Sequence, residues 1–231
     1  MDAVLSRLLT GAQVSQAIDF FDAFTEKRTT SWAEADLQAK GKAASLSHIP
    51  ELRGQLRHHL GEEALKASAE QAGLATTTMR SAPAGGVFQL ARIGRFALSS
   101  VKTNVERGRL RPAVTRELLA RANHELDPQS SLLPPEPGSA TVHEIAYFGC
   151  LAAVPTRRDP MVPSILALGV PDVSMRHWLF WIPLPMLAAK MRGIRETGVA
   201  PKAEPEQKDA AFPTLLLPKK PGSSSGTTGS V

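Results

Sequence analysis

The sequence predicts an α+β fold, in which a layer of helices packs on an antiparallel sheet made of two meanders. Two observations indicate this fold. Apolar side chains recur at every third or fourth position through the first 75 residues, whereas short apolar runs rich in β-branched and aromatic residues come later, separated by proline and glycine. With 231 residues, 42% of them hydrophobic, the chain is long enough to bury one substantial core.

Residues 1–75 are predicted to form the helical layer. Ser31 and the glutamate three residues later match a capping box, so we expect one helix to begin near Trp32. Further helical stretches are expected from Pro50 onward. Gly73 is well placed to end the last of them, because glycine readily adopts the left-handed conformation found at helix ends.

The two groups of strands are predicted to share one sheet, with the helices stacked on one of its faces. The first group spans residues 76–101, where Gly94 is expected to form a bulge. A helix after Pro112 separates the groups, and another after Pro185 closes the domain. The second group consists of three apolar runs bounded by proline or turn residues, namely 144–154, 164–170 and 177–184.

The domain is predicted to end near residue 197. Residues 76–197 form the strand and helix part of the same domain as the helical layer, interrupted by a proline-rich linker at 128–138. Residues 198–231 are predicted to be a disordered tail, because proline, lysine, glycine and serine dominate there. The apolar segment 212–217 within it would either dock on a partner or fold back on its own domain, and the sequence leaves both open.

The positive charge of the chain is concentrated in one segment. The 27 basic and 22 acidic residues give a net charge of +5, but residues 80–121 alone carry +7. Eight of the nine cations in that segment are arginines, whose planar guanidinium groups bind phosphate through two hydrogen bonds at once. Residues 1–79 have a net charge of −2, and the remainder of the chain is neutral. A polyanionic partner is therefore expected to meet residues 80–121.

We predict a bacterial-type cytoplasmic DNA-binding or DNA-associated accessory protein that contacts phosphates and has no enzymatic activity, cofactor or metal. About five phosphate contacts would make the logarithm of affinity fall with log salt at a slope of roughly −4.5. The prediction requires the cations to converge on one contiguous surface. Those assigned to DNA contact, without preference for sequence, are Arg92, Arg95, Lys102, Arg107, Arg109, Arg111, Arg116 and Arg121.

Two other interpretations of the same charges remain open. The chain would instead be an interaction module or inhibitor, whose arginines and tail bind an acidic protein. Alternatively, carboxylates of the helical layer, such as Glu62, Glu63 and Glu70, would neutralise the arginines within an ordinary solvated surface.

His58 and His59 each precede a glutamate by four residues. This spacing places His58 and Glu62 on one face of a helix, either as metal ligands or as a hydrogen-bonded pair. A metal site needs three or four ligands, and only histidines remote in sequence would complete it, so the sequence favours the hydrogen-bonded pair.

The remaining candidates for catalysis are predicted to be structural. Cys150 lies among apolar neighbours, and its separation of seven from His143 places the two on opposite faces of a strand. The HExxH and GxxxxGK[ST] motifs do not occur, and GxSxG is matched only at residues 222–226, in the glycine- and serine-rich tail, where no strand–turn–helix context is predicted. An enzyme site in the second group of strands would need at least two of four residues in one pocket, namely Glu144, Asp159, Asp172 and His177.

Two further features bear on partners. Trp178 and Trp181 would be core residues in a central strand, but in an edge strand they would form a surface for a partner. No run of about 18 apolar residues, no secretory leader and a single cysteine together predict a cytoplasmic protein with no membrane partner.

Overall fold

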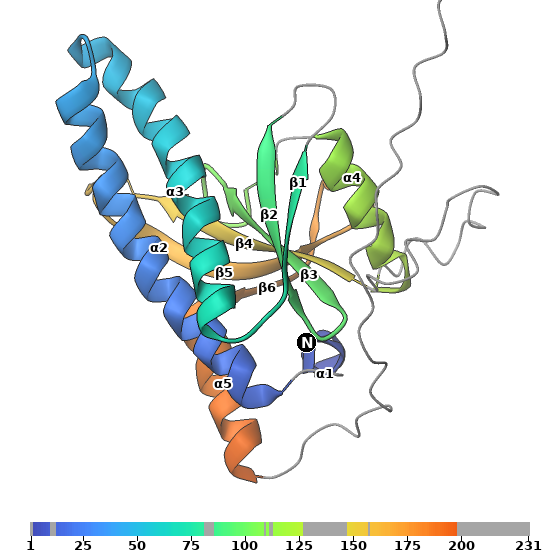
Figure 1. Cartoon of the computed structure of the whole chain (residues 1–231). Coiled ribbons are helices and arrows are strands. Elements are labelled where there is room, and N and C mark those ends of the chain that lie inside the picture. Colours follow the sequence, from blue (N-terminus) through green and yellow to red (C-terminus); the bar gives the residue numbers. More distant parts are fainter. Residues whose placement is uncertain are drawn as a thin grey trace, which may run out of the picture.

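The protein forms a six-stranded mixed sheet with helices on both faces, as seen in a computed structural model (Figure 1). The structure describes residues 2–9, 13–80, 86–108, 110, 113–126, 147–156 and 158–197. The sheet has the order β1-β2-β3-β4-β5-β6. Its strands are β1 (Thr76–Arg80), β2 (Val87–Ile93), β3 (Phe96–Lys102), β4 (Tyr147–Pro155), β5 (Pro163–Pro171) and β6 (Trp178–Pro183).

The α+β class is confirmed, but the fully antiparallel arrangement is wrong, and the stretch 87–101, predicted as one strand with a bulge, forms the two strands β2 and β3. Within the sheet, β3 and β4 are parallel, while each of the other neighbouring strands is antiparallel. The chain leaves the sheet after β3, passes through α4 (Val114–Ala120) and the 3₁₀ helix η2 (Arg121–Leu126), and re-enters in the same direction. Parallel neighbours require such a crossover, so the two meanders join through a parallel pair of strands.

The N-terminal layer consists of α1 (Asp2–Leu9), α2 (Val14–Lys42), the 3₁₀ helix η1 (Leu46–His48) and α3 (Ile49–Gln71). The predicted helix start near Trp32 is wrong, because α2 runs through it without a break. The Ser31 hydroxyl donates to the Arg28 carbonyl, 3.0 Å away, within the helix instead of capping a new one. The prediction for Gly73 is confirmed, since it follows the end of α3 with a φ of +69°.

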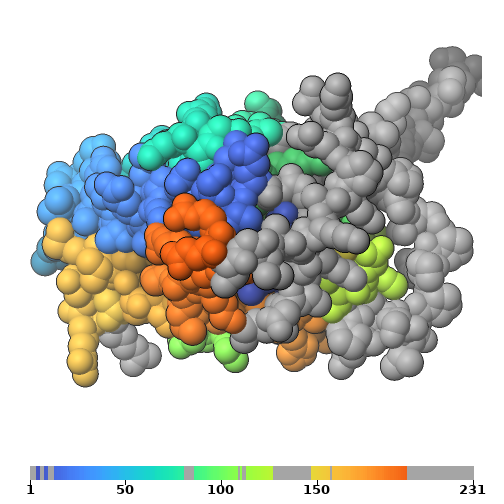
Figure 2. Space-filling view, turned by 90° about the horizontal axis from the view of Figure 1, so that it is seen from below, coloured from blue at the N-terminus to red at the C-terminus, as the bar shows by residue number. Residues whose placement is uncertain are grey.

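One face of the sheet is covered by α2, α3 and α5 (Leu184–Thr197), which bury the larger of two cores. Phe20, Phe21 and Phe24 of α2 are at most 1% exposed and belong to the same core as Leu98 and Leu168 of the sheet. Each fully buried side chain of this size contributes about 1.5–3 kcal/mol. Figure 2 shows α5 lying beside α2, where an Arg192–Asp22 ion pair joins the two helices.

The opposite face carries α4, which corrects the prediction that all helices stack on one face. Leu119 and Ala120 of α4 share a second core with Leu90, Phe148 and Cys150. The local periodicity of a helix identifies its apolar side but not which face of a sheet that side will meet.

The predicted bulge at Gly94 is also wrong. Ile93 pairs directly with Phe96, so Gly94 and Arg95 form the two-residue turn between β2 and β3. Gly94 has a φ of +52°, a conformation that costs glycine little, and such turns favour glycine at the first central position.

No helix in the described parts of the chain is both long enough and apolar enough to span a bilayer. The Pro112 start of α4, the linker at 128–138, and the tail from 198 with its 212–217 segment all lie outside the described residues.

Candidate functional site

The sheet opens between β2 and β3 at one end. Their pairing stops at Leu90 and Ser99, although β2 extends to Val87 and β3 extends to Lys102. Over the same stretch β1 stays paired with β2, and β4 stays paired with β3. We call this opening, between residues 87–89 and 100–102, the β2–β3 fork. Figure 1 shows the β1–β2 hairpin standing steeply against β4, β5 and β6.

Two side chains of α3 bind the edge of β2 that faces the fork. The Gln89 N–H, which an unbroken ladder would direct to β3, donates instead to Oε2 of Glu62. One turn earlier, His58 makes a hydrogen bond with the Val87 backbone. Nδ1 of His58 lies 3.8 Å from Oε1 of Glu62. The structure therefore places His58 and Glu62 together, in a pair that holds the opened strand edge.

Burial of Glu62 changes its acidity. Glu62 is only 7% exposed, and this burial raises the pKa of its carboxyl group to about 7. The Gln89 N–H, Arg28 and Arg116 act in the opposite direction, but their effects are smaller than that of burial. The pKa of His58 is lowered, chiefly by burial and then by His59 and the two arginines. Glu62 therefore exchanges its proton near neutral pH.

Arg28 and Arg116 approach this pair from opposite faces of the sheet. Arg28 extends from α2, is 1% exposed, and donates through Nη1 to the Arg57 carbonyl at 2.7 Å. Arg116 extends from α4 on the other face, yet it acts electrostatically on Glu62, on His58 and on Cys150 of the second core. The fork is thus the point where charged groups of both helical layers meet through the sheet.

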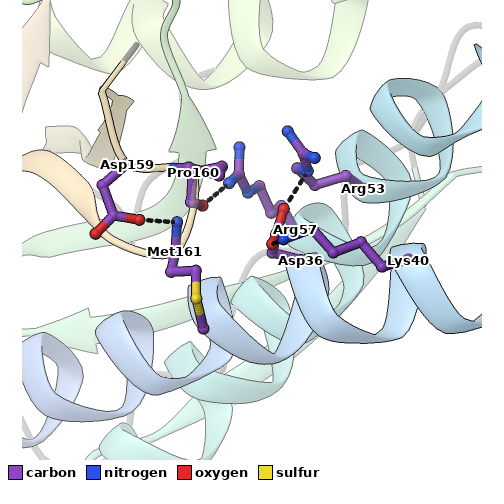
Figure 3. A network of polar contacts seen from close by, with 7 residues as sticks. All are labelled: Asp36, Lys40, Arg53, Arg57, Asp159, Pro160 and Met161. Atoms are coloured by element: carbon purple, nitrogen blue, oxygen red, sulfur yellow. Dashed lines mark hydrogen bonds and ion pairs between the residues drawn. The ribbon is translucent and has the colours of Figure 1, made fainter. Parts of the chain in front are cut away.

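A network of polar contacts joins α3 to α2 and to the loop after β4 (Figure 3). The Arg57 guanidinium lies over the Trp32 ring, 4.0 Å from its centre, and donates to the Pro160 carbonyl in the loop after β4. Asp36 of α2 forms ion pairs with Arg53 at 2.7 Å and with Lys40 at 2.6 Å. These contacts tie α2, α3 and the β4–β5 loop together, so the helix that carries Glu62 is firmly positioned.

The predicted DNA-contacting cations divide into separate groups. Lys102 ends β3 at the fork, and Arg116 acts on the fork residues. Arg92 and Arg95 lie at or beside the β2–β3 turn, at the opposite end of β3, about 20 Å away by strand rise. Arg121 begins η2, which reaches that same end, because Asn123 of η2 hydrogen-bonds to Phe148 near the start of β4.

The three remaining predicted cations follow β3 in the chain. Arg107 lies in the loop after β3, where the next residue, Gly108, accepts a hydrogen bond from Nε1 of Trp178 at 3.3 Å. Arg109 and Arg111 lie outside the described residues. The described cations are therefore spread over about 20 Å of the sheet and do not all lie at one end, so any phosphate contact at the fork would involve only some of them.

The acidic residues considered for catalysis have structural contacts. Asp159 accepts a hydrogen bond from the Met161 N–H at 2.8 Å, and Asp172 accepts one from the Arg176 N–H at 2.8 Å. The two carboxylates lie at opposite ends of β5, about 25 Å apart by strand rise. Asp172 also accepts a hydrogen bond from the His177 N–H at 3.1 Å. These two residues therefore lie in the same turn, where the carboxylate binds backbone N–H groups. His143 and Glu144 lie outside the described residues.

The predicted burial of Cys150 is confirmed. Its thiol lies in the second core, and burial raises the pKa of Cys150 to about 12. It is therefore a thiol, not a thiolate, at neutral pH. In the described part of the chain, no three His, Cys, Asp or Glu side chains group as ligands for a metal ion.

The two tryptophans lie in an edge strand. Among the described strands β6 pairs only with β5, and Trp178 and Trp181 are both half-buried. Their ring centres are 5.0 Å apart, and both rings pack where a side chain at position 169 would stand, which explains Gly169 in β5. This placement corresponds to the edge-strand alternative of the sequence.

Sequence reasoning noticed the spacing of His58 and Glu62 but not the fork that they border. It also passed over Arg28, because nothing local distinguishes a buried arginine from a solvated one. Comparison of the chain with models of known protein families, with curated proteins and with solved structures gave no match.

Proposed function

We propose that this protein binds DNA without enzymatic action, contacting phosphates through cations gathered around the β2–β3 fork. The observation that supports this most is that Arg80 of β1 and Lys102 of β3 end strands on the two sides of the fork, while Arg116 of α4 acts electrostatically on Glu62 and His58 at its edge. Residues distant in sequence that bring like charges together create a local positive potential, which attracts a polyanion.

The positions of the three cations follow from strand register. Arg80 is paired with Val87, the residue whose backbone contacts His58. Lys102 is the last residue of β3, on the opposite side of the fork. The side chains of Arg80 and Lys102 are exposed, and that of Arg116 is half-buried. We expect these cations to donate to phosphates at the fork, because arginine and lysine are the usual phosphate donors in proteins.

The proposal includes no catalysis because the acidic residues considered for it make structural hydrogen bonds. Glu62, Asp159 and Asp172 each accept a hydrogen bond from a backbone N–H. Their oxygens hold turns or a strand edge, which is a structural task.

The test is binding of a fluorescent duplex of arbitrary sequence as a function of salt. The double variant Lys102→Gln/Arg116→Gln should weaken binding at about 50 mM salt at least tenfold, because each lost phosphate contact reduces the salt slope by about 0.9. The matched control is Arg92→Gln/Arg95→Gln, which removes the same charge from one half-buried and one exposed position at or beside the β2–β3 turn, at the other end of β3. It should change affinity less than twofold.

The proposal fails if the wild-type protein does not bind duplex at about 50 mM salt. Equal losses in the two double variants would retain DNA binding but remove the fork as its site.

A second candidate is an interaction module that binds an acidic protein. The edge position of β6 and its two half-buried tryptophans favour it, because tryptophans concentrate binding energy at protein interfaces. An acidic partner that co-purifies and is lost on deletion of residues 205–231, with no duplex binding, would establish this candidate over the first.

A further inference from the structure

The fork contains a carboxyl group in the middle of its positive charges. Glu62 comes from α3 on one face of the sheet, and it is acted on by Arg28 of α2 and by Arg116 of α4 on the other face. The preceding turn of α3 adds His58, and β2 contributes the uncharged Gln89 N–H. When ionised, Glu62 is thus an internal anion held by the same kinds of groups that would bind a phosphate.

One oxygen of this carboxyl group is unused. Oε2 accepts the Gln89 N–H, but Oε1 is buried without a hydrogen-bond partner among the described residues. Nδ1 of His58 lies 3.8 Å from Oε1. A protonated Glu62 would have an O–H to donate toward the imidazole, whereas an ionised Glu62 would place a negative charge at the edge of the fork and repel a phosphate bound there.

We propose that phosphate binding at the β2–β3 fork is coupled to uptake of a proton by Glu62, so that the protein binds DNA more tightly in mildly acidic than in mildly alkaline solution. This inference rests on the proposed function and adds a regulation of the same site. The coupling is reciprocal, because a bound phosphate must favour the protonated carboxyl as much as protonation favours the phosphate.

The direction follows from the acidity of the group. Burial raises the pKa of Glu62 to about 7, so the carboxyl is mostly protonated at pH 6 and mostly ionised at pH 8. Protonation of His58, whose pKa is lowered chiefly by burial, acts in the same direction, because it adds positive charge beside Glu62 in acidic solution. Each unit by which phosphate raises the pKa of Glu62 corresponds to a factor of up to ten in affinity across this range.

The experiment measures duplex affinity at pH 6 and pH 8 at constant salt, with 5′-hydroxyl ends so that the DNA charge does not change. Wild-type protein should bind about fivefold to tenfold more tightly at pH 6. Glu62→Gln should lose most of this difference, because the amide keeps an oxygen for the Gln89 N–H but has no carboxyl proton to exchange; only the smaller contribution of His58 remains. The control Glu63→Gln alters an exposed neighbour and should keep the wild-type dependence.

A second measurement does not depend on the variant folding. Carboxyl carbon NMR of labelled wild-type protein should show the Glu62 pKa rising when duplex is added. An unchanged pKa, or a Glu62→Gln variant with the full wild-type pH dependence, overturns the coupling while leaving DNA binding intact.

If no duplex binds at any pH, the proposed function fails, and the NMR titration with inorganic sulfate decides the coupling separately. Sulfate keeps its charge between pH 6 and pH 8. A Glu62 pKa raised by sulfate supports a proton-linked anion site, and an unchanged one overturns it.

Discussion

Gly61 lies where the guanidinium group of Arg28 approaches the backbone of α3. A Cβ at this position would overlap Nη1, Nη2 and the central carbon of that guanidinium. Arg28 is fixed by its hydrogen bond to the Arg57 carbonyl, and burial lowers the pKa of Arg28 to about 10. Glycine is therefore required here by close approach of a buried charge, although glycine inside a helix is otherwise unfavourable.

Gly61→Ala should lower the free energy of unfolding by about 2 kcal/mol or more, because the displaced Arg28 loses the partners that compensate its burial. Gly54 is the matched control in the same helix, since a Cβ there would have no neighbour within 4 Å. Gly54→Ala should raise stability by about 0.5–1 kcal/mol. Urea denaturation measures both, and equal effects would contradict the close approach.

Glu62 should also make stability depend on pH. Its pKa is raised to about 7 from an ordinary value of 4.5, so the folded state holds the proton more tightly than the unfolded chain. The contribution of this group is fully present below pH 4.5 and is lost as pH rises toward 7. Relative to Glu62→Gln, the wild-type protein should lose up to about 3 kcal/mol across this window. Thermal melts at pH 4.5 and 7.5 test this, and parallel curves for the two proteins would refute it.

At the scale of elements, Asn123 fastens the crossover to the sheet. Its amide donates to the Phe148 carbonyl at 2.9 Å and to the Pro171 carbonyl at 2.8 Å, and its oxygen accepts from the Phe148 N–H at 2.8 Å. The residue is fully buried. It thus joins η2 to the end of β5 and to the start of β4, the strand that runs parallel to β3.

Asn123→Ala should lower the free energy of unfolding by about 2–4 kcal/mol. The two carbonyls and the one N–H that bind its side chain would lose that hydrogen-bond partner. Asn104→Ala, at an exposed position in the loop after β3, should change stability by less than about 0.5 kcal/mol. Chemical denaturation compares the two, and a small effect at Asn123 would mean that water replaces its contacts.

Helices and strands were predicted well where the pattern of their own apolar and turn residues determines the secondary structure. The three apolar runs of the second group became β4, β5 and β6, and the helix after Pro185 became α5. The capping box at Ser31 failed because Trp32 and Asp36 are needed inside a long helix, against α3, where burial outweighs about 1 kcal/mol of capping energy.

At the scale of the whole molecule, the distribution of charge depends on topology. Lys102 and Arg95 lie at the two ends of β3, so the described cations of the +7 segment are spread along the sheet. Only some of them act at the fork, such as Arg116, which α4 places within electrostatic reach of Glu62. The comparison of double variants at the two ends of the sheet tests this division directly.

The sequence by itself determined the α+β class, the stretches of chain in which the strands lie and the burial of Cys150, because periodicity and local composition report which side chains avoid water. Only the tertiary structure decided that β3 and β4 run parallel, that α4 covers the second face, and that His58 and Glu62 border an opening in the sheet. Those features depend on which distant strand edges pair and where pairing stops, and no local pattern in the chain encodes that choice.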